Sequence, residues 1–210
     1  MNRYSNQGLR NVPESVLHLS IINVLFFVVT SASFGQQWFG SLIGYYVESP
    51  AFRPWQIVTH MFMHGSFMHL LFNVFFGIYM FGGTLAKVWG NQRFLMYYFI
   101  CGFGAFLLHQ AFLHYNVSVG EAIHPFLGAS GAVYGVLVAY AYLFPNTELF
   151  VMFIPIPIKA KFVVLGLLAI DIFFGFSGIN SGIAHFAHLG GALTGFLLLM
   201  YWQRNKKRFY

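Results

Sequence analysis

Long apolar runs, separated by short polar or Gly/Pro-rich breaks, dominate this sequence. Each run is close to the about 20 residues that a helix needs to cross a bilayer. Six of them can be drawn, covering roughly residues 16–34, 66–83, 93–114, 129–144, 161–177 and 182–202. Only 8% of the 210 residues are charged, whereas 58% are hydrophobic. A water-soluble domain needs more surface charge, so we expect an all-α membrane protein with a bundle of six transmembrane helices.

The connection between the first two predicted helices, residues 35–65, has a different character from the other loops. It is apolar and aromatic, but glycines and prolines break it too often for a membrane span. Its tryptophans and tyrosines (Trp38, Trp55, Tyr45 and Tyr46) are residue types that favour the membrane–water interface. We therefore expect this loop to lie in or on the membrane surface.

The lysines and arginines between the helices predict how the bundle is oriented. Positive residues gather in the cytoplasmic loops of membrane proteins. Ten of them fall on one side of the predicted bundle, and only Arg53 falls on the other. The ten are Arg3, Arg10, Lys87, Arg93, Lys159, Lys161, Arg204, Lys206, Lys207 and Arg208. Both termini are therefore expected in the cytoplasm.

Several classes of protein are disfavoured at this stage. The net charge of +6 comes from basic residues scattered at helix ends, so we do not expect nucleic-acid binding. The single cysteine, Cys101, lies in an apolar run and excludes a disulfide framework. No Ala-x-Ala-type cleavage site follows the first apolar run, so the first helix is expected to be retained.

Four polar side chains are predicted to converge in the outer half of the membrane, where polar groups are costly and indicate function. Ser130 lies in the first turn of the fourth helix, and His188 lies about six residues into the sixth. If Ser66 caps the second helix, His69 and Asn73 follow on one face, four residues apart. All three helices run inward, so these groups share a depth.

Small residues are placed to bring the fourth and sixth helices together. Gly131 and Gly135 form a GxxxG face on the fourth helix, next to a serine flanked by small residues. Gly191 and Gly195 form a second such face, on the same side of the sixth helix as His188. Faces of this kind let helix backbones approach closely. We therefore expect the imidazole to reach the serine hydroxyl.

A serine within about 3 Å of a neutral histidine can act as a nucleophile, because the imidazole takes its proton. Ser130 and His188 are therefore predicted to form a dyad for acyl transfer. The backbone amides of Ala129 and Ser130 at the start of the fourth helix, with His69 and Asn73, can donate to the developing oxyanion. Each feature alone also fits helix packing or hydrogen bonding between helices, and their convergence favours the catalytic interpretation.

Asp171 is the only acidic residue predicted inside the membrane. The fifth helix carries no other member of the constellation, so we interpret Asp171 as a packing or hydration residue. His185, one turn before His188, could tune access to the site or cap the outer helix end, and we favour the cap. His60 and His64 are expected to brace the long loop against the second helix.

Three spaced motifs resemble those of the rhomboid family of intramembrane serine proteases. The stretch "HMFMHGSFMHLLFN" contains His60, His64, His69 and Asn73, "GASG" (128–131, with Gly128) contains Ser130, and "AHLGGALTG" contains His188. Together they extend the resemblance over essentially the whole chain. The departure is in the long loop, where many relatives have Trp-Arg and this chain has Trp55 and Gln56.

The resemblance implies cleavage of substrate transmembrane helices near the outer face, with Ser130 as nucleophile and His188 as base. It implies oxyanion donors at His69, Asn73 and the Ser130 amide, and a Tyr134 ring stacked on the imidazole. The fifth helix and the loop after it would gate lateral entry of substrate. The expected partners are transmembrane proteins and the lipid bilayer. No cofactor and no metal ion are expected.

Other interpretations of the function stay open. A catalytically silent rhomboid-like protein would capture transmembrane helices without cutting them. Nine histidines could hold a metal or haem, although no His-Glu-x-x-His motif is present. A transporter is disfavoured because the two halves show no repeat. A single domain over 1–210, without a seventh helix or an appended domain, and a bacterial inner-membrane location are expected; the substrate and the oligomeric state are not predicted.

Overall fold

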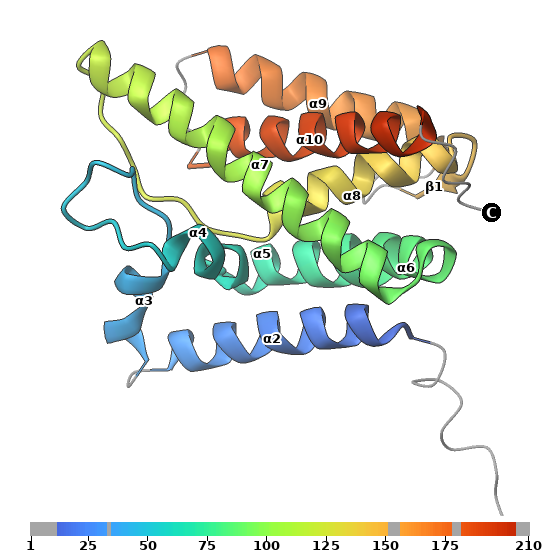
Figure 1. The fold of residues 1–210 in the computed structure, drawn as a ribbon, viewed down its shortest axis with the longest axis horizontal. Coiled ribbons are helices and arrows are strands. Elements are labelled where there is room, and N and C mark those ends of the chain that lie inside the picture. Colours follow the sequence, from blue (N-terminus) through green and yellow to red (C-terminus); the bar gives the residue numbers. More distant parts are fainter. Residues whose placement is uncertain (1–11, 33–34, 151–155, 178–181, 205–210) are drawn as a thin grey trace, which may run out of the picture.

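The computed structural model describes residues 12–32, 35–150, 156–177 and 182–204, and these form a bundle of long helices (Figure 1). The helices follow the predicted order. They are α2 (Glu14–Ser31), the run of α5 (Phe67–Leu71), η2 (Phe72–Gly82) and α6 (Gly83–Trp89), α7 (Asn91–Ser118), α8 (Ser130–Leu143), α9 (Ala160–Phe176) and α10 (His185–Arg204). A short antiparallel pair, β1 (Glu148–Leu149) and β2 (Ile158–Lys159), lies between α8 and α9. No pattern in the sequence predicts this pair of strands.

The second long helical run ends later than predicted, at Trp89 rather than at residue 83. Lys87 lies inside its last turns with an exposed side chain. A lysine can extend its apolar stem along a helix and keep its ammonium group at the interface, so it does not end a helix as a loop residue would. The run stops at Gly90, whose φ of 80° lies in the left-handed region. The middle of the run, η2, has the wider turns of a π-helix.

Helix α10 packs mainly against α7 and α8, and to a smaller extent against α9 (Figure 1). The glycine faces predicted for α8 and α10 meet directly. A Cβ atom on Gly191 would overlap the backbone carbonyl of Gly131, and one on Gly195 would lie 2.9 Å from the Cα of Gly135. No side chain fits between the two helices at these points. Their backbones are in contact, as the GxxxG pattern predicts.

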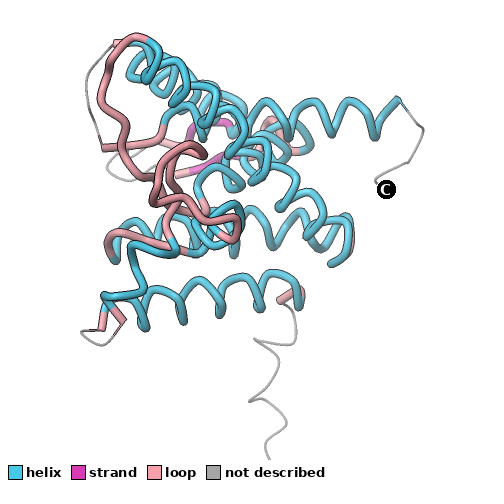
Figure 2. Tube along the Cα trace, turned by 60° about the vertical axis from the view of Figure 1, so that its left-hand side comes forward, coloured by secondary structure: helices cyan, strands magenta, loops and turns pink. Residues whose placement is uncertain are grey.

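The long connection after α2 is partly helical, with α3 (Gln36–Leu42), α4 (Gln56–Thr59) and η1 (His60–Phe62). Its loops gather at one end of the bundle (Figure 2). Gln110 of α7 binds this connection twice, because its side-chain amide donates to the Tyr45 carbonyl (2.9 Å) and accepts from the Val47 amide (3.0 Å). Gln56 is fully buried and donates to the Ser41 and Ala51 carbonyls, both at 3.2 Å.

Many large apolar side chains on the outside of the bundle are exposed, among them Leu25, Leu107, Phe173 and Leu197. Within the described residues, Glu14–Ser31, Phe67–Trp89 and Asn91–Ser118 are long and apolar enough to cross a membrane. Ser130–Leu143 is a shorter apolar helix. A soluble protein rarely exposes so continuous an apolar surface, so the chain is an integral membrane protein. Helix α2 begins and α10 ends at the same end of the bundle (Figure 1).

Candidate active site

The helical run that begins with α5 and continues into η2, together with α8 and α10, carries the predicted polar residues. All three begin at the same end of the bundle (Figure 1). The Ser66 hydroxyl caps α5 by accepting from the His69 amide at 3.1 Å, as predicted. Ser130 is the first residue of α8. Helix α10 begins at His185, three residues later than predicted, so His188 lies in its first turn rather than deeper.

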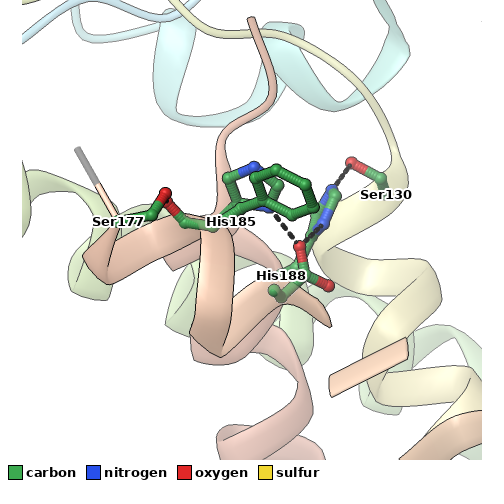
Figure 3. A network of polar contacts seen from close by, with 6 residues as sticks. Ser130, Ser177, His185 and His188 are labelled. Atoms are coloured by element: carbon green, nitrogen blue, oxygen red, sulfur yellow. Dashed lines mark hydrogen bonds and ion pairs between the residues drawn. The ribbon is translucent and has the colours of Figure 1, made fainter. Parts of the chain in front are cut away.

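Ser130 and His188 are in direct contact (Figure 3). The Oγ atom of Ser130 lies 2.8 Å from Nε2 of His188, a distance at which a proton can pass between them. The Tyr134 ring, one turn into α8, stacks on the imidazole with centroids 4.2 Å apart and planes 11° apart. This stacking holds the plane of the imidazole, so that Nε2 stays aimed at the hydroxyl.

Gly128 forms the turn that leads into α8 and, because it has no side chain, lets the His69 ring come close to the serine. Its φ of 121° is in the left-handed region, which favours glycine. A Cβ there would lie 2.8 Å from Nε2 of His69 and 3.5 Å from Oγ of Ser130. The His69 ring therefore faces the same small volume as the serine hydroxyl. The Gly128 amide donates to the His60 carbonyl at 2.9 Å, which ties the turn to the long connection.

Asn73 is buried on the same helical run, one turn beyond His69. Its side-chain amide donates to the His69 carbonyl at 3.0 Å. An asparagine amide has two N–H groups, so the second can serve another acceptor.

Asp171 belongs to the same cluster, and its interpretation as a packing residue was wrong. Its side chain on α9 is 2% exposed, and Oδ1 lies 3.0 Å from Nδ1 of His188. The same oxygen contacts Nδ1 of His185, so His185 also does more than cap its helix. Asp171 and His188 lie 17 residues apart on separate helices. No local sequence pattern indicates such a contact.

The remaining histidines of the first motif, His60 and His64, lie in the long connection. The His60 ring bonds through Nδ1 to the Gln56 carbonyl at 2.7 Å, and its ring packs against Phe106 and Phe126. Burial lowers the pKa of His60 to about 4. The His64 ring meets the His69 ring edge to face, with centroids 5.0 Å apart. His64 therefore braces the connection against the second helix as expected, whereas His60 braces it against α7 and the loop before α8.

A small cavity adjoins Ser130 and has mostly small residues in its walls. Gly102, Ala105, Gly131 and Ala132 contribute to it, and larger walls come from Met61 and Phe126. The volume of this cavity is only about 10 Å³, so it has room for a small group and not for a large one.

One group of metal-ligating side chains lies in the described part of the chain. Asp171, His185 and His188 each offer one ligand atom, and these atoms lie within 4.8 Å of one another. The two Nδ1 atoms already share Oδ1 of the carboxylate, so hydrogen bonds account for the arrangement without an ion.

Comparisons with known proteins identify the family of this chain. Residues 51–205 match the family model described as the Rhomboid domain, which is more than half of the chain. The chain belongs to the rhomboid family. The predicted resemblance is therefore confirmed, and the polar residues of α5, η2, α8 and α10 lie within the matched region of this rhomboid.

Similar rhomboids occur in bacteria and plants. The protein named "Putative rhomboid protease YdcA" from Bacillus subtilis is 31% identical over 201 residues, which is 93% of this chain and 90% of YdcA. RHOMBOID-like protein 4 from Arabidopsis thaliana is 33% identical over 144 residues, 69% of this chain. The aligned part spans only 33% of that plant protein. Rhomboid protease AarA from Providencia stuartii is 28% identical over 69% of this chain and 54% of its own length.

Proposed function

We propose that this rhomboid is an intramembrane serine endopeptidase that cleaves transmembrane segments of membrane proteins. The observation that carries the proposal is the 2.8 Å contact between Ser130 Oγ and His188 Nε2 inside an apolar bundle. Two bacterial relatives, YdcA and AarA, have names that include the words rhomboid protease. A hydroxyl becomes a useful nucleophile only when a base takes its proton, and this contact supplies the base.

The mechanism follows from these two side chains. His188 Nε2 takes the hydroxyl proton while Ser130 Oγ attacks the carbonyl carbon of the scissile peptide bond. The tetrahedral intermediate collapses when the imidazolium gives that proton to the leaving amine, and an acyl-serine remains. A water molecule, deprotonated by the same imidazole, then attacks the ester. The products are a carboxylate and the regenerated Ser130 hydroxyl.

Hydrogen-bond donors around Gly128, which has no side chain to block them, stabilise the oxyanion of the intermediate. The donors are the backbone amides at Ala129 and Ser130, a ring N–H of His69 and the second amide hydrogen of Asn73. Helix α8 begins here, so its first N–H groups have no partner within the helix. Donors fixed in advance stabilise the developing charge without reorganising.

The substrate is a transmembrane segment whose backbone is extended near Ser130. A helix with Gly, Pro or other weak helix formers near its outer end is favoured, since it unwinds at low cost. The cavity beside Ser130, with a volume of about 10 Å³, favours a small residue before the scissile bond. With both termini in the cytoplasm, the cut lies near the outer face of the membrane, and a bacterial inner membrane is the proposed location.

Cleavage of model transmembrane substrates in proteoliposomes tests this proposal. The substrates carry a small or a bulky residue before a Gly-Pro-weakened outer segment, and mass spectrometry locates the cut. We expect the wild type to cleave the small-residue substrate near its outer end, and Ser130→Ala to fold but cleave nothing. Turnover by Ser130→Ala would contradict the mechanism. Binding without cleavage by the wild type would favour the catalytically silent alternative, and stoichiometric zinc in the purified protein would favour a metal site at Asp171.

A further inference from the structure

We propose that Asp171 is a positioning residue that, together with His185, holds His188 in the one tautomer that can accept the Ser130 proton. This inference rests on the proposed function and extends its dyad by a buried carboxylate. It departs from the sequence-based interpretation, in which helix α9 contributed nothing to the site.

The contacts of the carboxylate determine where the protons lie. Oδ1 of Asp171 is within hydrogen-bond distance of Nδ1 on both His185 and His188. An ionised carboxylate can only accept hydrogen bonds, so each Nδ1 must carry a proton. A neutral imidazole has one N–H, and in His188 it is therefore on Nδ1. Nε2 is left with its lone pair facing the Ser130 hydroxyl at 2.8 Å.

No other described contact of the imidazole selects this tautomer. The Tyr134 ring lies parallel to the plane of the imidazole, so it fixes the plane but is indifferent to which nitrogen is protonated. The serine hydroxyl can donate or accept, so its contact with Nε2 fits either tautomer. With Nε2 protonated, the imidazole would donate to the serine and could not take its proton. The carboxylate removes that unproductive state.

His185 offsets part of the cost of burying the carboxylate and keeps Oδ1 in place. A carboxylate buried without partners is strongly unfavourable, and each donated hydrogen bond offsets part of that cost. His185 gives the second donor to Oδ1, and its own ring stacks on Phe174 of α9, with centroids 5.7 Å apart and planes 16° apart. His185 and Ser130 lie on opposite sides of His188 (Figure 3). The hydrogen-bonded side chains therefore follow one another in the order His185, Asp171, His188, Ser130.

The most direct test is the nitrogen-15 NMR spectrum of histidine-labelled protein in detergent, with His188 assigned from the spectrum of His188→Gln. We expect a protonated Nδ1 and an unprotonated Nε2 on His188 in the wild type. In Asp171→Asn, whose amide can donate to Nδ1, we expect the proton to move to Nε2. A wild-type His188 protonated on Nε2, or an unchanged tautomer in Asp171→Asn, would overturn the inference.

Kinetics on the cleaved model substrate give a second readout. We expect Asp171→Asn to lower kcat at least about tenfold and to change KM less than about twofold, because Asp171 acts through His188 and does not touch the substrate. In soluble Ser-His-Asp enzymes, the same Asp→Asn change lowers kcat by about 10⁴-fold. Asp171→Glu, which keeps the acceptor, should recover part of kcat. Asn23→Leu is the matched control, because Asn23 is a buried polar residue of α2 that bonds only its own helix.

The outcomes separate this inference from the proposed function. If the wild type cleaves and Asp171→Asn cleaves with the same kcat, the positioning role is wrong and the peptidase remains. If the wild type cleaves nothing, the proposed function fails, and the His188 tautomer still decides whether Asp171 positions the imidazole. If Asp171→Asn does not fold, the tautomer of the wild type alone decides.

Discussion

Ser130 and His188 meet because each stands in the first turn of its helix, and the two helices begin at the same end of the bundle. The side chains are held from different directions. Gly128 shapes the turn before Ser130, and Tyr134 stacks on the His188 ring. At the scale of single residues, the site therefore depends on a backbone turn and one ring contact as much as on the reacting atoms.

Asn73 offers a test of the oxyanion donors. We expect Asn73→Ala to lower kcat by roughly 10² to 10³, the usual loss for one oxyanion-hole donor, with little change in KM. The bond from Asn73 to the His69 carbonyl is also lost, so the melting temperature in detergent is measured beside the cleavage rate. A folded Asn73→Ala protein with the wild-type rate would remove Asn73 from the proposed oxyanion hole.

The sequence predicts some site residues better than others, for a physical reason. Ser130, His188 and His69 stand beside helix-start and glycine signals that are local, so their positions can be argued from spacing. Asp171 has no local signal. Its partners are on α10, and only the packing of α9 against α10 brings the carboxylate to Nδ1 of His188.

At the scale of elements, the contact between α8 and α10 sets the distance between hydroxyl and imidazole. We expect Gly191→Ala to lower both the melting temperature and the cleavage rate, because the added Cβ overlaps the rigid Gly131 carbonyl and separates the helices. Gly166→Ala in α9 is the matched control, since its Cβ would meet open space. Alanine favours helix over glycine by about 1 kcal/mol, so the control should be as stable as the wild type or more so. Wild-type stability and rate in Gly191→Ala would contradict this close packing.

The long connection before α5 predicts a pH dependence of stability. Burial lowers the pKa of His60 to about 4 and that of His64 to about 3, from a usual value of 6.5. Both are neutral in the folded protein, so the unfolded state binds more protons below pH 6.5. The contribution of these two neutral histidines to the free energy of unfolding is therefore fully present above pH 6.5 and is lost as the pH falls towards 4. The loss is about 2 kcal/mol per histidine at pH 5.

Thermal unfolding in detergent at pH 7.5 and pH 5 measures this effect. We expect a lower melting temperature at pH 5, and a smaller drop in His64→Leu, which removes one titrating ring. Equal drops in the two proteins would show that protonation of His64 does not weaken the connection.

The helices could be predicted because each is a long apolar run with clear breaks. Their ends were harder to place. Lys87 looks like a loop residue, yet its exposed side chain is compatible with the last turns of the helical run. The short helices α3 and α4 carry no strong periodicity, and tertiary bonds from Gln110 and Gln56 hold the connection around them. Contacts of this kind are not encoded by neighbouring residues.

At the scale of the whole molecule, the distribution of positive residues predicts the orientation. Glu48 and Lys87 are both exposed, and they lie at opposite ends of the bundle in the proposed topology. The single native cysteine, Cys101, is buried, so introduced cysteines can be labelled selectively. In intact bacterial cells, a membrane-impermeant maleimide should label Glu48→Cys and leave Lys87→Cys unlabelled until the cells are lysed. The reverse pattern would place the site on the cytoplasmic side and contradict cleavage at the outer face.

The central claim, an activated serine with its base, is tested most directly by a fluorophosphonate probe on purified protein in detergent. The probe reacts with a serine whose proton is removed by a neighbouring base, and it needs no knowledge of the substrate. We expect labelling of the wild type at Ser130, located by mass spectrometry, and none of Ser130→Ala or His188→Ala. A folded wild-type protein that stays unlabelled, or a His188→Ala protein labelled as fast as the wild type, would contradict the proposed mechanism.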